Sequence, residues 1–100
     1  MIMPKTERIL KEMGNQIRLA RLRREISVEM VANRAGVSRA SVWSVEKGAP
    51  SVSMGIYAKI LAAIGMQEDL LLICKDDLLG RELQDEKLDS RKRKTVKEGL

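Results

Sequence analysis

Two short segments in the first half of the chain each begin after a serine and end at a glycine. Ser27 precedes the first segment, which ends at Gly36, and Ser38 precedes the second, which ends at Gly48. A serine hydroxyl caps the N-terminus of a helix, and glycine ends a helix because it readily adopts the left-handed conformation. The spacing therefore predicts two short helices joined by a tight turn, the arrangement of a helix-turn-helix, at about residues 28–47.

Apolar residues at helical spacing predict further helices on both sides of this pair. In the stretch 6–25, one apolar stripe recurs every three or four positions: Leu10, Met13, Ile17 and Ala20. Gly14 and Asn15 interrupt this stretch, so the sequence leaves open whether it forms one helix or two. Ser51 is expected to cap a fourth helix, whose apolar face consists of Tyr57, Ile60, Leu61 and Ile64. Residues 67–75 predict a short apolar fifth helix.

The composition limits the core that these helices can form. The chain has 100 residues with no Phe, one Tyr and one Trp. Its core must consist of Leu, Ile, Val, Ala and Met, which suit short packed helices better than sheets. We expect the six Met residues, and Cys74 in its apolar surroundings, to be buried. The predicted fold is all-α, with a leading helical segment 1–14, a five-helix domain 15–75, and a short C-terminal extension with a mobile basic tail, 76–100.

Missing residue types exclude several function classes. With no His and one Cys, the chain cannot form a His-centred catalytic triad, a His metal cluster or an internal disulfide. The glycines are scattered singly, so no phosphate-binding loop is present. We therefore predict that the protein is not an enzyme and uses no cofactor or metal. The longest apolar run, Leu70–Cys74, is too short to span a membrane, and the N-terminus lacks a signal-peptide apolar region, which together predict a cytoplasmic protein without a membrane partner.

The distribution of charge along the chain and the second helix of the pair both indicate that the protein binds a polyanion. Residues 1–47 carry ten Lys or Arg and five Asp or Glu, whereas residues 48–80 carry two and four. On the helix 39–47, Val42 and Val45 share the side expected in the core. The opposite side carries Arg39, Ala40, Trp43, Ser44 and Lys47.

This outer side combines a bidentate donor, a second cation, small residues and one large ring. The DNA major groove admits a helix, and an Arg paired to guanine is the commonest specific contact there. The alternative is the solvated face of an ordinary helical bundle, which needs no function. An outward Trp argues against it, because monomers usually bury such a side chain, but the face alone leaves both interpretations open.

Residues 17–65 contain several short motifs in a characteristic order and spacing: Ile17-Arg-Leu-Ala-Arg21, Ile26-Ser-Val-Glu, Val31-Ala, Ala35-Gly-Val-Ser-Arg-Ala-Ser-Val42, Val45-Glu-Lys-Gly48, Pro50-Ser-Val and Leu61-Ala-Ala-Ile-Gly65. Through these motifs the chain shows a resemblance to the Xre-type helix-turn-helix family of phage Cro and repressor proteins. The resemblance implies a five-helix repressor-like fold that binds double-stranded DNA at palindromic operators as a homodimer.

The resemblance also implies roles for individual residues. The positions that face bases are Ser38, Arg39, Ala40 and Ser44, and Trp43 reaches the groove wall. Ser27, Val28 and the following amides match a site that holds a phosphate at a helix N-terminus. Val28 stands where the family very often has Gln, so one side-chain contact to phosphate is lost. Arg21 and Glu46 match an internal ion pair, with a phosphate contact of Arg21 as the alternative.

The C-terminal part resembles a subgroup of this family. Residues 76–85, the basic stretch that follows them, and Pro50–Tyr57 are similar to HipB-like regulators encoded with HipA-type kinase toxins. The resemblance implies an antitoxin that represses its own operon and binds a HipA-like kinase. The run Arg91, Lys92, Arg93 and Lys94 is expected to follow phosphates, to dock on a partner, or to stay solvated and idle.

The apolar run in the acidic middle of the chain is expected to be the seam of a homodimer, through Leu70, Leu71 and Ile73.

The sequence gives almost no support to an enzyme, and two other function classes compete. One is a sequence-specific transcriptional repressor. The other is a protein-interaction module that binds a partner such as the kinase without reading DNA. The hypothesis of an interaction module predicts a neutral outer face on residues 39–47, whereas this face is basic.

Overall fold

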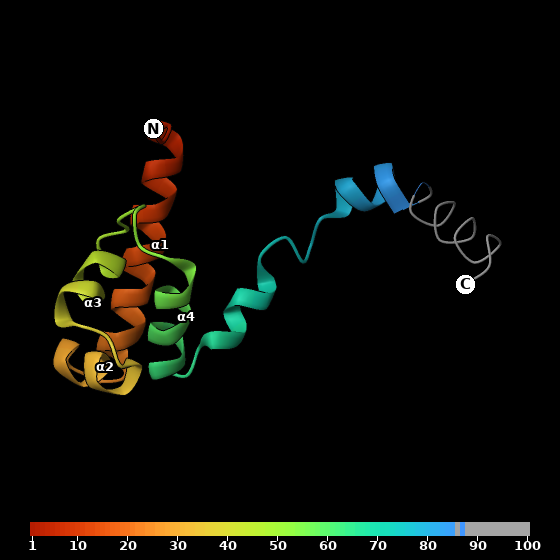
Figure 1. Cartoon of the computed structure of the whole chain (residues 1–100). Coiled ribbons are helices and arrows are strands. Elements are labelled where there is room, and N and C mark those ends of the chain that lie inside the picture. Colours follow the sequence, from red (N-terminus) through yellow and green to blue (C-terminus); the bar gives the residue numbers. More distant parts are fainter. Residues whose placement is uncertain (86, 88–100) are drawn as a thin grey trace, which may run out of the picture. The chain divides into compact units, whose positions relative to one another are not determined.

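Helix α1 spans Pro4–Arg23 and is the longest helix of the chain (Figure 1). A proline suits the first turn of a helix, because its missing amide hydrogen has no helical partner there. Gly14 and Asn15 lie inside this helix without interrupting it. The stretch that the sequence left open as one helix or two is therefore a single helix, which includes the leading segment. The computed structural model describes residues 1–85 and 87.

Helices α2, Val28–Ala35, and α3, Arg39–Glu46, form the predicted helix-turn-helix. Gly36 ends α2 with a φ of 67°, in the left-handed region that glycine enters without a steric penalty. Its amide and that of Val37 both donate to the carbonyl oxygen of Ala32. The chain then turns within two residues, and Ser38 caps α3.

Helix α4, Met54–Ala63, begins later than the sequence indicated. Its N-cap is Ser53, whose hydroxyl oxygen accepts a hydrogen bond from the amide of Ile56 at 3.3 Å. The prediction of Ser51 as this cap is wrong, because residues 50–52 form a turn before the helix starts. The apolar face of α4 is nevertheless the expected one, and Gly65 follows it with a φ of 78°.

The core lies between α1, α2, α3 and α4, with α3 packed on α1 and α2, and α2 packed on α4. Val31, Val42 and Val45 are fully enclosed, each with 0% of its surface exposed. The other buried apolar residues are Ile17, Ala20, Ala32, Tyr57, Ile60, Leu61 and Ile64. The structure confirms an all-α fold with a core of aliphatic residues and one tyrosine.

The chain after α4 begins with a 3-10 helix, η1, at Gln67–Leu72. This is the predicted fifth helix, shorter and more tightly wound than expected, and it is followed by turns. The described chain divides into a unit Met1–Leu70 and a second unit that begins at Leu71. In the second unit, residues 78–85 are helical, and the carboxylate of Asp77 accepts a hydrogen bond from the amide of Gly80 at 3.0 Å.

Two predictions of burial are wrong. Cys74 is exposed, because the turns after η1 leave it and the adjacent Ile73 without a core around them. Most of the methionines are not core residues either. Met1, Met3, Met30 and Met54 are exposed, whereas Met13 and Met66 pack partly against the core. The apolar residues that suggested burial instead supply exposed surface at several places along the described chain.

Candidate nucleic-acid interface

The N-terminus of α3 is positioned by a pair of serines. The hydroxyl oxygen of Ser38 accepts a hydrogen bond from the amide of Ser41 at 3.1 Å. The hydroxyl groups of the two serines also lie 3.0 Å apart, within hydrogen-bond distance of each other. The role of Ser41 was not foreseen from the sequence, although a cap and a polar residue three positions later is a known helix-start signature.

The two sides of α3 differ in exposure as the sequence predicted. Val42 and Val45 point into the core, where they fix the rotation of the helix about its axis. On the outer side, the side chain of Trp43 is 51% exposed. The remaining members of this outer face are Arg39, Ala40 and Lys47, which are exposed, and Ser44, which is half-buried. We call these five residues the outer face of α3.

The dimensions of this face suit a groove. An α-helix with its side chains is about 10–12 Å across, and the major groove of DNA is about 12 Å wide. Ala40 and Ser44 are small, so the helix axis can come close to a groove floor. Arg39 lies in the first turn and Lys47 just beyond the last, so the two cations stand at opposite ends of the face.

The N-terminus of α2 lies at the other end of the motif. The hydroxyl oxygen of Ser27 accepts a hydrogen bond from the amide of Met30 at 3.1 Å. Ser27 itself is exposed and Val28 is half-buried. A helix N-terminus carries a partial positive charge and amide donors, so it can hold an anion. The apolar side chain of Val28 adds no hydrogen bond to such an anion.

Arg21 and Glu46 form an ion pair that connects α1 to the end of α3. Nε and Nη2 of Arg21 donate to the two carboxylate oxygens of Glu46, at 2.7 Å and 3.1 Å. Nη1 of Arg21 donates to the carbonyl oxygen of Ile26 at 2.8 Å. Both side chains are about nine-tenths buried. The guanidinium therefore holds the C-terminal end of α3 and the turn before α2 in one arrangement.

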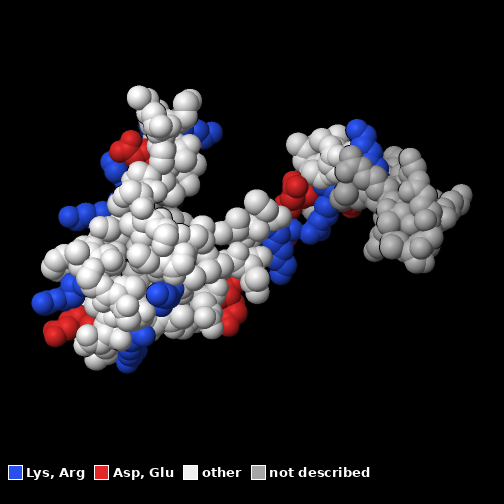
Figure 2. Space-filling view, in the orientation of Figure 1, with Lys and Arg blue, Asp and Glu red and all other residues white. Residues whose placement is uncertain are grey.

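The basic side chains of this unit are spread over its surface. In Figure 2, Lys and Arg side chains stand out at several separate points rather than merging into one patch. On the face that Figure 2 shows, the unit therefore presents separate cations and not one continuous basic band. Positioned cations favour recognition of particular groups over general attraction to a polyanion.

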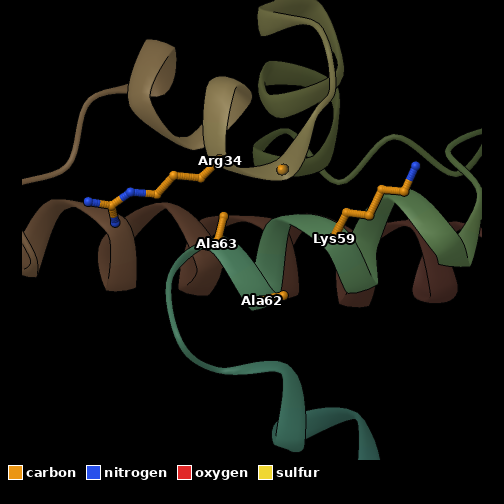
Figure 3. Close-up of a pocket in the computed structure, with 5 residues that line it drawn as sticks. Arg34, Lys59, Ala62 and Ala63 are labelled. Atoms are coloured by element: carbon orange, nitrogen blue, oxygen red, sulfur yellow. The ribbon is translucent and has the colours of Figure 1, made fainter.

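One shallow pocket of about 330 Å³ lies away from α3. Arg34 and Ala35 of α2 and Lys59, Ala62 and Ala63 of α4 line it. In Figure 3 the charged groups of Arg34 and Lys59 point away from each other, so they do not converge on one point. Among the described residues, no group of three His, Cys, Asp or Glu side chains could hold a metal ion.

The residues predicted as a dimer seam separate into two kinds. Leu70 is half-buried and packs against the core. Leu71 and Ile73 are 75% and 61% exposed. The basic run 91–94 lies outside the described residues.

A capped two-helix motif whose second helix presents an outer face with two cations and an exposed Trp defines a helix-turn-helix protein. A family model described as a helix-turn-helix domain matches residues 12–72, which is more than half of the chain. The chain belongs to this family, whose members are DNA-binding regulators of the Xre-like kind. No curated protein and no solved structure matches the chain. In the part of the chain that the structure describes, no helix has both the length and the apolarity of a membrane span.

Proposed function

We propose that this protein is a sequence-specific transcriptional repressor that binds a palindromic operator as a homodimer. The observation that carries the proposal is the outer face of α3. Its exposed Arg39, Trp43 and Lys47 are held in a fixed orientation by two fully buried valines on the opposite side of the same helix. In this proposal the face enters the major groove, and Arg39 donates to the edge of a guanine.

Backbone contacts on both sides of the groove complement the base contacts. The amides at the N-terminus of α2 hold one phosphate, as the partial positive charge of a helix N-terminus allows. Ser38 and Lys47 lie at the two ends of α3 and contact the DNA backbone or the adjacent bases. Phosphate contacts set the register of the protein on the duplex, and base contacts supply its sequence preference.

The proposed homodimer explains why the proposed operator is a palindrome. Two recognition helices related by a twofold axis contact half-sites about 34 Å apart, one helical turn of DNA. The exposed Leu71 and Ile73 support self-association, because monomers rarely leave several large apolar side chains of one segment in water. Leu70, the last residue of the first unit, packs against the core.

The role in the cell follows from the similarity of residues 50–57 and 76–85 to HipB-like regulators. We infer that the protein represses the operon that encodes it and binds a HipA-like kinase toxin as its antitoxin. The described helix at residues 78–85 exposes Leu78, Leu79 and Leu83. This surface supports an alternative function, a module that binds a protein partner without reading DNA.

Selection of duplexes from a random library separates the two functions. A repressor enriches one sequence with twofold symmetry, and footprinting then shows two protected half-sites about one turn apart. The library is incubated with the full-length protein at 0.15 M salt, so that nonspecific attraction is screened. Bound duplexes with no common sequence would contradict the repressor and favour the interaction module.

A further inference from the structure

The residues just before α1 and the first turns of α1 carry exposed apolar side chains. Figure 1 shows this end of the helix extending beyond the other helices. Ile9 is 55% exposed, and Ile2 and Met3 are exposed as well. Leu10 in this stretch is half-buried, and the backbone of Leu10 and Lys11 lies against Gly48. We call residues 2–11 the α1 overhang. It continues the apolar stripe that farther along α1 packs on the core through Met13 and Ile17.

A second apolar surface, uncovered within its own unit, follows η1. We call residues 71–85 the leucine segment. Six large apolar side chains of this segment are more than half exposed: Leu71, Leu72, Ile73, Leu78, Leu79 and Leu83. Exposed apolar area of this extent on a small protein marks a surface that another molecule covers.

The two surfaces carry opposite charge. The α1 overhang has three cations and one carboxylate, Lys5, Arg8, Lys11 and Glu7. Lys11 pairs with Glu7 at 3.4 Å, and neither Lys5 nor Arg8 has an ion-pair partner among the described residues. The leucine segment has four carboxylates and two cations, Asp76, Asp77, Glu82, Asp85, Lys75 and Arg81. Each surface therefore carries a net charge of two, positive on the α1 overhang and negative on the leucine segment.

This charge pattern selects among the ways in which two copies can associate. Pairing the leucine segment with its own copy would bring carboxylates together, and pairing two overhangs would bring Lys5 and Arg8 of both copies together. Like charges placed opposite each other across an interface disfavour association, whereas complementary charges favour it. Only the pairing of an overhang with a leucine segment joins apolar surface to apolar surface with opposite charge.

We propose that the leucine segment of one copy covers the α1 overhang of a second copy, and that the second copy returns the same contact. A twofold axis makes the contact twice, so each dimer covers two overhangs and two leucine segments. The inference rests on the homodimer of the proposed function and names the surfaces that form it. Leu71 and Ile73 then contact the overhang of the partner copy and not their own counterparts.

Charge reversal on each surface separately tests the proposal. One variant carries K5E and R8E, which make the overhang acidic. The other carries E82K and D85K, which make the leucine segment basic. All four positions are exposed, and the new carboxylate at position 5 suits the N-terminal end of α1 on which it lies. Far-ultraviolet circular dichroism checks that both variants keep the helical content of the unchanged protein.

In each variant alone, both contacts of the dimer place like charges together. Sedimentation velocity at 0.05 M salt without DNA should show at least tenfold weaker self-association for either variant than for the unchanged protein. In an equimolar mixture of the two, every contact again joins opposite charges. The mixture should therefore form a heterodimer at concentrations where each variant alone is monomeric.

A matched control carries R34E and K59E, the same change of net charge at the pocket between α2 and α4. This control should dimerise like the unchanged protein. Four results would overturn the proposal: an unchanged protein that is monomeric, a K5E and R8E variant that still dimerises, a mixture that stays monomeric, or a control that dissociates. The measurement contains no DNA, so a protein that dimerises as stated but selects no operator would count against the DNA-binding proposal alone.

Discussion

Gly14 of α1 and Gly48, which follows α3, pack backbone against backbone. A Cβ atom on Gly14 would lie 2.7 Å from the amide nitrogen of Gly48 and 2.6 Å from the carbonyl oxygen of Val45. A Cβ atom on Gly48 would collide with the backbone of Leu10 and Lys11. Helix α1 therefore approaches the end of α3 as closely as two backbones allow, and neither glycine can carry a side chain without moving the other helix.

Replacing Gly14 with Ala should destabilise the protein by about 1–3 kcal/mol, the usual effect of overpacking. This loss outweighs the helix propensity gained from Ala, which is about 1 kcal/mol. Gly55→Ala is the matched control in α4, where the nearest atom to a new Cβ is the hydroxyl oxygen of Ser53 at 3.9 Å. The control should stabilise the protein. Urea denaturation measures both changes, and equal effects would show that the close approach of α1 is unimportant.

Removing one partner of the Arg21–Glu46 pair should strongly destabilise the fold. Glu46→Leu leaves a buried guanidinium without its carboxylate and should lower the free energy of unfolding by about 3–5 kcal/mol. The double variant R21M/E46L should lose less than the sum of its single variants, because no unpaired charge remains buried. Denaturation of all four proteins of the cycle gives the coupling energy, and additive losses would contradict this account.

Arg39→Ala should relax the choice of base at one position in each half-site, at a cost of about 1–3 kcal/mol for the preferred base. Binding titrations against operator variants measure this preference. Lys59→Ala removes an exposed cation from α4 and should leave the preference intact. If Arg39→Ala weakens binding to all variants equally, Arg39 contacts only a phosphate.

Leu71→Glu should convert the dimer to a folded monomer with greatly weakened operator binding, because a carboxylate would enter an apolar contact. Leu19→Glu changes an exposed leucine of α1 outside the α1 overhang and should leave the dimer intact. Sedimentation equilibrium reports the mass of each variant. A tight dimer of Leu71→Glu would place the dimer contact elsewhere on the molecule.

Tyr57 should make the fold sensitive to alkaline pH. Burial raises the pKa of its phenol above the ordinary value of 10.0, and its hydroxyl donates to the carbonyl oxygen of Ala49 at 3.3 Å. The unfolded chain loses this proton at lower pH than the folded one, so the contribution to stability is full below pH 10 and falls as pH rises through the raised pKa. Above pH 10, the unfolding free energy of the unchanged protein should fall more steeply than that of Tyr57→Phe. If the unfolding free energies of the unchanged protein and of Tyr57→Phe fall equally above pH 10, the phenol of Tyr57 does not cause the alkaline sensitivity.

Local signals account for what the sequence could predict. The caps at Ser27 and Ser38 and the turn at Gly36 depend on residues within one helical turn, and the structure has them as expected. The cap of α4 was missed because Ser51 and Ser53 offer the same local signal, and only the turn at residues 50–52 decides between them.

Burial depends on packing between distant segments, which a run of apolar residues does not specify. The apolar neighbours of Cys74 predicted its burial for this reason, yet Cys74 is exposed and, of the run 70–74, only Leu70 packs against the core. On α3 the periodic pattern was sufficient, because Val42 and Val45 lie one turn apart and must face the same way. The positions of the α3 side chains were therefore predictable, whereas the exposed overhang of α1 was not.

The exposure of Trp43 has a practical consequence. The chain contains one Trp, and it stands on the outer face of α3, half in water. All indole fluorescence of the protein therefore originates at the surface proposed to meet DNA. Its wavelength and its quenching by added iodide report directly on whether this face is covered, so the unlabelled protein carries its own optical probe of operator binding.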